Sequence, residues 1–211
     1  MKLDSIRREY GFTKLSRGKV EKSPFKQFGI WLDEAIGLKV NEATAMSVVT
    51  IDSDGFPQSR IVLLKSFDEK GFTFFTNYSS EKGKSIEQNP RIGLHFFWSE
   101  MERQIRISGL AEKISTKASN KYFHSRPISS QIAAHISNQS EEILNREYLE
   151  NRFYDLQNKL QGEIPIRPKL WGGYHVKPIK IEFWQGRENR LHDRILYLKQ
   201  DKHWFIKRLA P

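Results

Sequence analysis

Three side chains that can bind an anion or exchange a proton occupy alternate positions near the end of the chain: Arg190, His192 and Arg194. Residues 181–184 form a β-type run, the next residues include the Gly and Asn that turns favour, and the pattern predicts a second strand over residues 190–198. Side chains alternate between the two faces of a strand, so these three are predicted to share one face. Two permanent cations around one titratable ring favour recognition of an anion.

The opposite face of this predicted hairpin is unusual for a simple surface strand. Alternation places Asp193 there with Leu191 and Ile195, and a carboxylate among aliphatic side chains is costly unless a cation pairs with it. A solvated edge strand is the alternative interpretation, but Asp193 and the neighbouring Trp184 argue against it. We therefore interpret the hairpin as an anion-recognition element.

The same segment carries a family resemblance. Glu, an aromatic residue and Trp at positions 182–184, followed by Arg-Leu-His-Asp-Arg at positions 190–194, resemble the signature of the pyridoxine (pyridoxamine) 5′-phosphate oxidase family. The similarity extends over nearly the whole chain, from Arg-Arg-Glu-Tyr at residues 7–10 to Arg-Leu-Ala-Pro at residues 208–211. It implies an α+β fold that is mainly β with helices, in the form of an FMN-binding split β-barrel.

Size and composition fit one globular domain with an appendage. The chain has 211 residues, 38% of them hydrophobic and 28% charged, and no apolar run approaches the roughly 20 residues that span a bilayer. The absence of cysteine removes disulfides and thiolate metal sites, and the first residues lack the apolar core of a signal peptide. We expect no metal, no membrane insertion and a cytoplasmic location, with residues 1–22 as a mobile N-terminal arm and residues 23–211 as one domain.

The charge balance narrows the partners without choosing one. There are 35 basic and 25 acidic residues, a formal net charge of +10, which fits nucleic acid, an acidic surface or small phosphorylated ligands. Basic and acidic residues are mostly interleaved, and no zinc-finger, P-loop or Rossmann glycine pattern is present. A nucleic-acid-binding protein therefore remains only the alternative from a different functional class.

Hydrophobic periodicity and turn residues predict a sheet that is interrupted and followed by helices. Ser23 is a predicted N-cap and Pro24 the first helical residue of a helix that stops at Gly37. A meander of this many short strands tends to close into a barrel. The predicted strands cover residues 45–51, 58–65, 72–76, 91–98 and 103–115, and the further helices cover residues 81–88, 117–125, 128–135 and 141–160.

The resemblance assigns the cofactor side of the site. It implies that FMN is bound by Arg60, Ile61, Val62, Leu63, Leu64, Lys65, Phe75, Thr76, Lys82, Gln104, Gln139, Ser140, Trp184 and Arg194. Alternative interpretations stay open for several of these residues. Arg60 and Lys65 would also suit salt bridges to acidic turns, Gln104 would suit a plain surface position, and Gln139 with Ser140 would suit an N-cap of the following helix.

The resemblance also assigns the substrate side. Tyr122, Arg126 and Ser130 are four apart, a spacing that aligns side chains on one helix face, although Pro127 breaks the helix. Residues 7–10 match a segment that folds over bound substrate in the family, and a disordered basic tail is the alternative. The implied substrate-binding residues are Arg7, Arg8, Glu9, Tyr10, Lys65, Tyr122, Arg126, Ser130, Arg190, Leu191 and His192, with Arg190 and His192 as catalytic residues.

One departure from the family pattern concerns the cofactor phosphate. Family members commonly have Ser-Arg-Lys where this chain has Ser80-Glu81-Lys82, so an acid replaces a cation. Lys82 and Arg60 would then hold the phosphate together with backbone N–H groups at the start of a helix. Weaker FMN binding than is usual in the family is the expected consequence.

The activity implied by the resemblance is that of a pyridoxal 5′-phosphate synthase. Pyridoxine 5′-phosphate or pyridoxamine 5′-phosphate is oxidised to pyridoxal 5′-phosphate, FMN accepts the hydride, and O₂ reoxidises the flavin to give hydrogen peroxide. A flavin carries the hydride chemistry, so the protein needs to supply only binding, orientation and electrostatics. Another FMN-binding split-barrel reductase is the alternative. A homodimer with FMN between the chains is expected, since an open sheet edge near Phe96, Phe97 and Trp98 needs cover.

Overall fold

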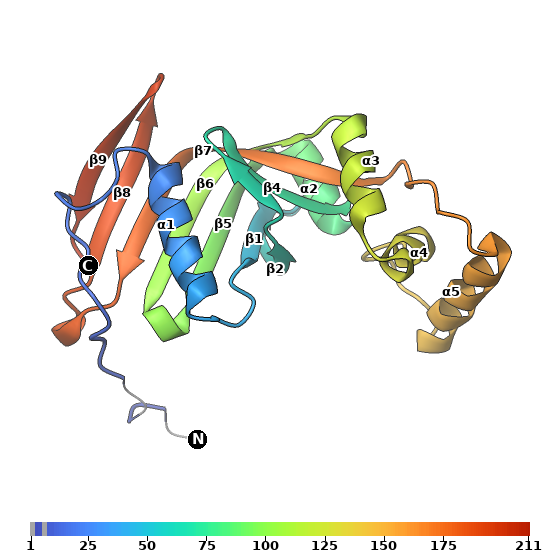
Figure 1. Ribbon diagram of the computed structural model, residues 1–211, viewed down its shortest axis with the longest axis horizontal. Coiled ribbons are helices and arrows are strands. Elements are labelled where there is room, and N and C mark those ends of the chain that lie inside the picture. The colour runs from blue at the N-terminus through green and yellow to red at the C-terminus, as the bar shows by residue number, and fades with distance from the viewer. Residues whose placement is uncertain (1–2, 6–7) are drawn as a thin grey trace.

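The computed structural model describes residues 3–5 and 8–211, which form an elongated α+β molecule (Figure 1). The predicted α+β class, mainly β with helices, is confirmed. The helices are α1 Pro24–Gly37, α2 Glu81–Gln88, α3 Thr116–Ser125, α4 Ile128–Ile136 and α5 Arg146–Leu160, with short 3₁₀ turns η1 Ser99–Met101 and η2 Glu188–Arg190. The strands are β1 Ala45–Ile51, β2 Pro57–Leu63, β3 Ser66–Asp68, β4 Gly71–Asn77, β5 Arg91–Trp98, β6 Arg103–Lys113, β7 Trp171–Gln185, β8 Asp193–Gln200 and β9 His203–Leu209.

One curled antiparallel sheet holds all of these strands. Its order is β2-β1-β5-β6-β7-β4-β3, with β8 beside β7 and β9 beside β8. The long strand β7 pairs with β6 along most of its length, with β4 at its start and with β8 at its end. The β6–β7 register shifts between Ser108 and Gly109, where a Cβ on Gly109 would lie 2.5 Å from the Lys177 carbonyl oxygen. Only glycine permits this close approach, which bends the sheet.

Helix α1 covers the sheet and closes its core (Figure 1). Phe28 is fully buried, with its ring centroid 4.9 Å from that of Phe72 and 5.3 Å from that of Phe96. Trp31, one turn further along the helix, meets Phe183 edge to face at 5.2 Å. The predicted bounds of α1 are confirmed, and the Ser23 hydroxyl caps the helix by accepting from the Lys26 N–H.

The predicted strand over residues 190–198 is wrong at its start. Residues 188–190 form η2, Asn189 and Arg190 have φ values of 54° and 59°, and β8 begins only at Asp193. Left-handed backbone cannot continue a strand. The strand alternation that placed Arg190 and His192 on one face and Leu191 on the other therefore does not apply. Leu191 is in fact 69% exposed, whereas Asp193 and Ile195 are buried as predicted.

The predicted helix over residues 141–160 also begins later than expected. Helix α5 starts at Arg146, where Asn145 Oδ1 accepts from the Tyr148 N–H at 2.8 Å. Gln139 and Ser140 were candidate cap residues for this helix, and that alternative is wrong because both contact the start of α2 instead. Asn145 supplies the same local side-chain acceptor and is the N-cap.

The described part of the N-terminal arm lies along the end of β7 and along β8. Leu15 is buried, and its N–H donates to Asp193 Oδ2 at 3.0 Å. Further along, the Tyr197 hydroxyl donates to the Glu21 carbonyl oxygen at 2.7 Å. The arm thus has ordered contacts with the sheet, and its mobility stays a prediction. Arg7, one of the predicted substrate residues, lies outside the described residues.

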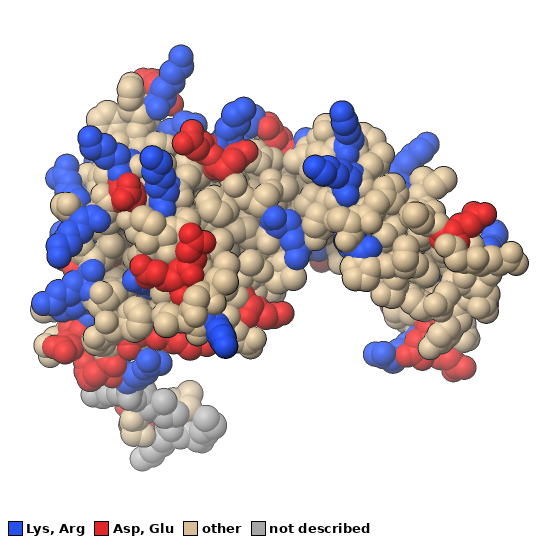
Figure 2. Space-filling view, viewed as in Figure 1, with Lys and Arg blue, Asp and Glu red and all other residues tan. Residues whose placement is uncertain are grey.

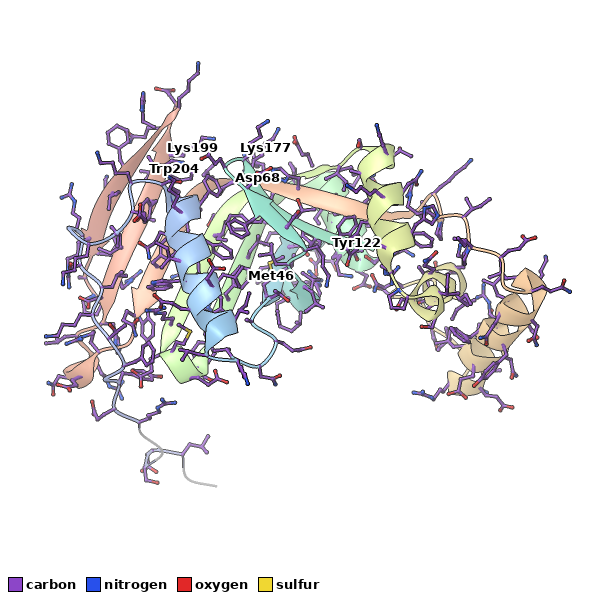
Figure 3. All side chains as sticks on the ribbon, in the orientation of Figure 1. Met46, Asp68, Tyr122, Lys177, Lys199 and Trp204 are labelled. Carbon is purple, nitrogen blue, oxygen red and sulfur yellow. The ribbon has the colours of Figure 1, made fainter. Side chains whose placement is uncertain are left out.

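The surface supports the interpretation of interleaved charge. Figure 2 shows Lys and Arg among Asp and Glu over the visible face, without one continuous basic tract. No helix among the described residues is long and apolar enough to cross a membrane. Figure 3 shows the length of the molecule, with Trp204 on β9 near one end and Tyr122 on α3 toward the other.

Candidate active site

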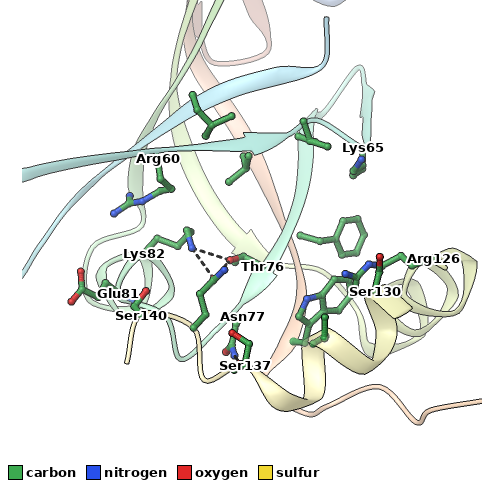
Figure 4. A pocket seen from close by; sticks show the side chains of 18 of the residues that line it. Arg60, Lys65, Thr76, Asn77, Glu81, Lys82, Arg126, Ser130, Ser137 and Ser140 are labelled. Carbon is green, nitrogen blue, oxygen red and sulfur yellow. Dashed lines mark hydrogen bonds between the residues drawn. The ribbon is translucent and has the colours of Figure 1, made fainter. Parts of the chain in front are cut away.

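A cavity of about 960 Å³ opens between β2, β4 and helices α2, α3 and α4. Figure 4 shows its lining from close by, with Arg60 and Lys82 toward one end and Lys65 and Arg126 toward the other. We call this space, defined by those four cations, the cationic cavity. Both of its ends carry two basic side chains, which suits a ligand or ligand pair with two separate anionic groups.

Lys82 lies at the first end in a buried position. Its Nζ donates to Gln139 Oε1 at 2.8 Å and to Thr76 Oγ1 at 3.2 Å, and Thr76 Oγ1 also donates to Gln139 Oε1 at 3.0 Å (Figure 4). Burial lowers the pKa of Lys82 to about 8, with Arg60 contributing in the same direction and Glu81 opposing it. The ammonium group is therefore ready to gain an anionic partner.

Arg60 reaches the same end from β2. Its Nη1 donates to Thr50 Oγ1 at 2.7 Å and to the Gln58 carbonyl oxygen at 3.0 Å. Burial lowers the pKa of Arg60 and attraction from Glu81 raises it, yet an Arg stays charged at any relevant pH. These contacts leave the alternative of a salt bridge to an acidic turn without support among the described residues.

The start of α2 completes this end of the cavity. The Ser80 hydroxyl accepts from the Gly83 N–H at 3.3 Å, and the Glu81 N–H donates to Ser140 Oγ at 3.4 Å. Ser140 has a φ of 75°, which turns its hydroxyl toward α2. The exposed Glu81 lines the cavity beside Arg60 and Lys82, so an acidic group does stand at this end.

The second end is built by a helix, a break and a helix. Helix α3 ends at Ser125, Arg126 is extended, and Pro127 begins the turn into α4, so Tyr122, Arg126 and Ser130 converge without sharing one helix face. The Tyr122 ring stacks on Phe75 with centroids 3.8 Å apart. Lys65 closes this end from the segment after β2.

Arg126 has unused hydrogen-bonding capacity. Its guanidinium carbon lies 4.6 Å from the ring centroid of Trp171, and its Nη1 is buried without a hydrogen-bond partner among the described residues. Burial lowers the pKa of Arg126 and raises that of Tyr122. A buried guanidinium nitrogen without a partner is costly, so an anion from a ligand would be strongly favoured here.

The run from Arg60 to Lys65 does not contribute uniformly. Ile61, Val62 and Leu63 line the cationic cavity, but Leu64 does not, because its side chain is 5% exposed and belongs to the core. Ile61 also lines a second cavity of about 530 Å³, which contains Gln104. There Gln104 Oε1 lies 3.2 Å from His95 Nε2, and Ile61 is the residue that lines both this cavity and the cationic cavity.

A second group of predicted residues meets where β7 ends and β8 begins. Trp184 and His192 have ring centroids 4.6 Å apart, and the Tyr10 ring lies edge-on at 5.8 Å from each of them. We call Tyr10, Trp184 and His192 the aromatic corner. Arg190 is exposed beside it, and Arg8 and Glu9 precede Tyr10 on the arm.

The protonation state of His192 follows from its contacts. Its Nδ1 accepts from the Arg187 N–H at 3.1 Å, and an accepting ring nitrogen carries no proton. The neutral ring therefore holds its proton on Nε2. Burial lowers the pKa of His192, and the charge of Arg190 lowers it further, which also favours the neutral form.

Two charged residues beside the corner are neutralised within the chain. Arg194 Nε donates to Glu182 Oε1 at 2.8 Å, and its Nη1 donates to the Ala210 carbonyl oxygen at 2.9 Å. Asp193 is paired with Arg208 and accepts from the Leu15 N–H, so the cation predicted for this carboxylate is present.

The structure thus brings the predicted residues together in two places. Trp171 lines the cationic cavity and Trp184 belongs to the aromatic corner, although both lie on β7. The thirteen steps between them correspond to roughly 43 Å of strand at about 3.3 Å per residue. Within one chain, the residues predicted to surround one flavin and one substrate therefore lie in two places far apart.

Sequence reasoning missed several residues at these places. Asn77, Ser137 and Trp171 line the cationic cavity, and the Asn77 amide donates to the Ser137 carbonyl oxygen at 3.5 Å. The sequence did offer a signal for Trp171, because it is the aromatic residue before a Gly-Gly pair at the start of a strand. Glu102, which contacts the arm, had none, because a left-handed φ of 53° at a non-glycine residue leaves no mark in the sequence.

Two family models match the chain. Residues 32–159 match the model described as pyridoxamine 5′-phosphate oxidase. Residues 171–211 match the model described as the pyridoxine 5′-phosphate oxidase C-terminal dimerisation region. The second match covers β7, β8 and β9, and hence the Trp184 and His192 side of the aromatic corner.

Similar proteins and structures agree with these matches. The chain is 51% identical over 213 residues to the pyridoxine/pyridoxamine 5′-phosphate oxidase of Hahella chejuensis, covering 100% of both chains. It is 49% identical over 207 residues to the enzyme of the same name from Trichormus variabilis, covering 98% of this chain and 97% of that one.

Among solved structures, PhzG from Burkholderia lata 383 in complex with tetrahydrophenazine-1-carboxylic acid superposes with a TM-score of 0.89 at 28% identity. The match covers 95% of this chain and 100% of that chain. A pyridoxamine 5′-phosphate oxidase-related, FMN binding protein from Nostoc punctiforme has a TM-score of 0.71 at 16% identity over 89% and 97% of the two chains, which confirms the split-barrel fold alone. With both family models and full-length relatives at about 50% identity, the chain belongs to the pyridoxamine 5′-phosphate oxidase family.

Proposed function

We propose that this protein oxidises pyridoxine 5′-phosphate and pyridoxamine 5′-phosphate to pyridoxal 5′-phosphate, with FMN as the hydride acceptor and O₂ as the final oxidant. The names of the full-length relatives at 51% and 49% identity support this activity. The single observation that carries the proposal is the cationic cavity, because one space holds two separate basic ends. A phosphorylated cofactor and a phosphorylated substrate would place one phosphate at each end.

The residues at the first end fit the phosphate of FMN. Lys82 Nζ and Arg60 Nη1 supply cationic donors, and the N-terminus of α2 adds backbone N–H groups and a favourable dipole. Thr76, Gln139 and Ser140 surround Lys82 and would orient it. Bound there, FMN supplies the hydride acceptor. This end of the cavity offers donors for a single phosphate, and the sequence has no dinucleotide-binding glycine pattern. Both features favour FMN over FAD.

The residues at the second end fit the phosphate of the substrate. Arg126 offers a buried Nη1 without a partner among the described residues, Tyr122 offers a phenolic O–H whose pKa is raised, and Lys65 adds a second cation. Ser130 adds a hydroxyl from α4. Fixed donors of this kind hold the substrate by a group remote from the reacting carbon, which gives affinity and orientation together.

The aromatic corner would reach the same ligands from a second copy of the chain. The dimerisation-region match over residues 171–211 supports a homodimer, and a symmetric dimer presents the same surface of each chain to the other. In this proposal the cavity of one chain and the Trp184, Arg190, His192 and Arg194 side of its partner make one site. Each dimer then has two complete sites.

His192 and Arg190 would act on the substrate ring by electrostatics. The neutral His192 ring offers its Nε2–H as a donor, because Nδ1 is occupied by the Arg187 N–H. Arg190 stays charged and is exposed, so it can approach a ligand that the partner chain holds. Together they would balance charge on the polar substituents of the ring while hydride leaves the reacting carbon.

The test is anaerobic mixing of the purified holoprotein with each B6 phosphate, followed by bleaching of the flavin absorbance. Reduction by both compounds, and release of hydrogen peroxide when air is readmitted, are expected. Chromatography of the released cofactor should give FMN, and stoichiometric FAD would contradict the cofactor assignment. A flavin reduced by a nicotinamide but by neither B6 phosphate would support the reductase alternative instead.

A further inference from the structure

An acidic side chain in the turn between β5 and β6 contacts the N-terminal arm. Glu102 is 5% exposed, its Oε1 accepts from Arg8 Nη2 at 3.2 Å, and its Oε2 accepts from the Phe12 N–H at 2.9 Å. A buried carboxylate is costly unless donors satisfy it. Both of these donors come from the arm, so the carboxylate and the arm stabilise each other.

The backbone of Glu102 ties the same turn to the end of β7. Its carbonyl oxygen accepts from the Gly186 N–H at 2.7 Å and from Gln185 Nε2 at 3.2 Å. Its φ of 53° lies in the left-handed region, which a non-glycine residue keeps only where surrounding contacts enforce it. Glu102 therefore joins the arm, the β5–β6 turn and the end of β7.

Tyr10 lies between the two residues that Glu102 holds, and it fills a slot over Gly186. A Cβ added to Gly186 would lie 2.8 Å from Tyr10 Cγ and 3.0 Å from Glu102 Cβ, so the slot requires glycine. From this slot the Tyr10 ring faces Trp184 and His192, at 5.8 Å from each. The position of Tyr10 in the aromatic corner thus depends on a contact outside it.

We propose that Glu102 is a positioning residue, which holds Arg8 and Phe12 so that Tyr10 is fixed against Trp184 and His192 before substrate arrives. This inference rests on the proposed function, since it gives the aromatic corner a part in substrate binding. Glu102 itself would touch neither substrate nor cofactor. With Tyr10 already ordered, substrate binding would not have to restrict its motion, and that entropic cost of binding would be avoided.

A second anchor makes the effect of Glu102 local. Leu15 N–H donates to Asp193 Oδ2 at 3.0 Å, and Arg187 Nη1 donates to the Thr13 carbonyl oxygen at 3.0 Å. These contacts hold the arm a few residues beyond Tyr10. Loss of the Glu102 contacts would therefore release the Tyr10 segment and leave the rest of the arm attached.

The experiment compares Glu102→Gln with Glu100→Gln in the holoenzyme. The control removes the same charge two residues away, at an exposed carboxylate that accepts from the Ser99 hydroxyl. Glu102→Gln should raise KM for pyridoxamine 5′-phosphate roughly tenfold with a smaller change in kcat and unchanged flavin content. Trypsin should also cleave after Arg8 faster in Glu102→Gln than in wild type or in Glu100→Gln.

A double-mutant cycle tests whether Glu102 acts through Tyr10. In a Tyr10→Ala background, Glu102→Gln should change KM by less than about twofold, because the side chain to be positioned is gone. Independent, multiplying effects would overturn the proposal. So would a lower melting temperature with KM and cleavage unchanged, since that indicates a merely structural role.

Two further outcomes keep the inference separate from the proposed function. If Glu102→Gln fails to fold, Arg8→Met, at a side chain 60% exposed, should raise KM in the same direction, and a wild-type KM would overturn the inference. If the wild-type protein oxidises neither B6 phosphate, the proposed function fails. Cleavage after Arg8 then still decides whether Glu102 holds the arm.

Discussion

The cationic cavity and the aromatic corner treat charge in opposite ways. In the cavity, Arg126 keeps a buried nitrogen without a partner among the described residues, and burial depresses the pKa of Lys82 to about 8. At the corner, two neighbouring charged residues are matched within the chain, Arg194 by Glu182 and Asp193 by Arg208, while Arg190 stays exposed. The cavity therefore holds uncompensated positive charge, whereas the corner offers nearly neutral rings.

This difference assigns different tasks to the two regions. Uncompensated cations in a partly buried space give affinity for anionic groups, since the ligand relieves a cost that the empty protein bears. A neutral corner of rings gives shape and orientation for a flat ligand. We expect changes in the cavity to alter binding and changes at Arg190 and His192 to alter the chemical step.

The largest expected effect tests whether the two regions meet across chains. Arg126→Met in the cavity and Arg190→Met beside the corner should each lower kcat/KM roughly a hundredfold. A mixed dimer with one lesion per chain should nevertheless retain about half of wild-type kcat/KM, because one of its two sites contains neither lesion. Co-expression with two affinity tags isolates this dimer.

The matched control for the mixed dimer pairs two lesions of the same region. A dimer of Arg126→Met with Lys65→Met should have only the low kcat/KM of the single variants, since each site then carries one of the cavity lesions. The same low kcat/KM in the Arg126→Met and Arg190→Met dimer would mean that each site is contained in one chain.

The next effect separates affinity from chemistry. Arg126→Met should raise KM roughly thirtyfold and lower kcat only about threefold, because the phosphate that it holds is remote from the reacting carbon. Arg190→Met should lower the rate of flavin reduction more than it raises KM. Stopped-flow reduction under anaerobic conditions measures both, and flavin content should be normal in each variant. Wild-type reduction rates in Arg190→Met would contradict its assignment to the chemistry.

A pH dependence distinguishes the first end of the cavity from the second. An FMN phosphate would favour charged Lys82, so FMN affinity should be constant below the free-protein pKa of about 8 and weaken as pH rises above it. The loss should approach about tenfold between pH 8 and pH 9.5. Quenching of FMN fluorescence by apoprotein measures this affinity, and Lys82→Met should bind more weakly and lose the dependence. The same pH profile in Lys82→Met would exclude Lys82 as its cause.

The smallest expected effect concerns the acid at the same end. Glu81 is exposed, so water screens its repulsion of a phosphate, and Glu81→Arg should tighten FMN only about threefold to fivefold. Glu87→Arg makes the same change of charge at the other end of α2 and should leave FMN affinity unchanged. Equal affinities for wild type and Glu81→Arg would place this side chain away from the phosphate.

Much of the cavity could be predicted from the sequence because its residues sit on regular elements with strong boundary signals. The bounds of α2 follow from Ser80 as cap and from the Asn89-Pro90 stop, and those bounds carry Lys82 into place. Tyr122, Arg126 and Ser130 also came together, though through a helix break at Pro127 rather than along one face.

The corner could not be predicted by the same means. Asn189 and Arg190 adopt left-handed backbone, and the strand period used for Arg190 and His192 is lost there. The contacts of Gln139 with Lys82 and of Glu102 with the arm join residues 57 and 90 or more positions apart. Only the tertiary fold decides such contacts, since local propensity carries no information about them.

The length of strand β7 sets the distance between the two regions, because it carries Trp171 at one end and Trp184 at the other. Inserting one residue within β7 would turn every following side chain to the opposite face of the sheet. Inserting two would restore the faces but move the corner about 6.6 Å further along. The number of residues in β7 therefore determines both which face each side chain occupies and how far the corner lies from the cavity. We expect natural variation in chain length to occur in the loops at the ends of β7 rather than inside it.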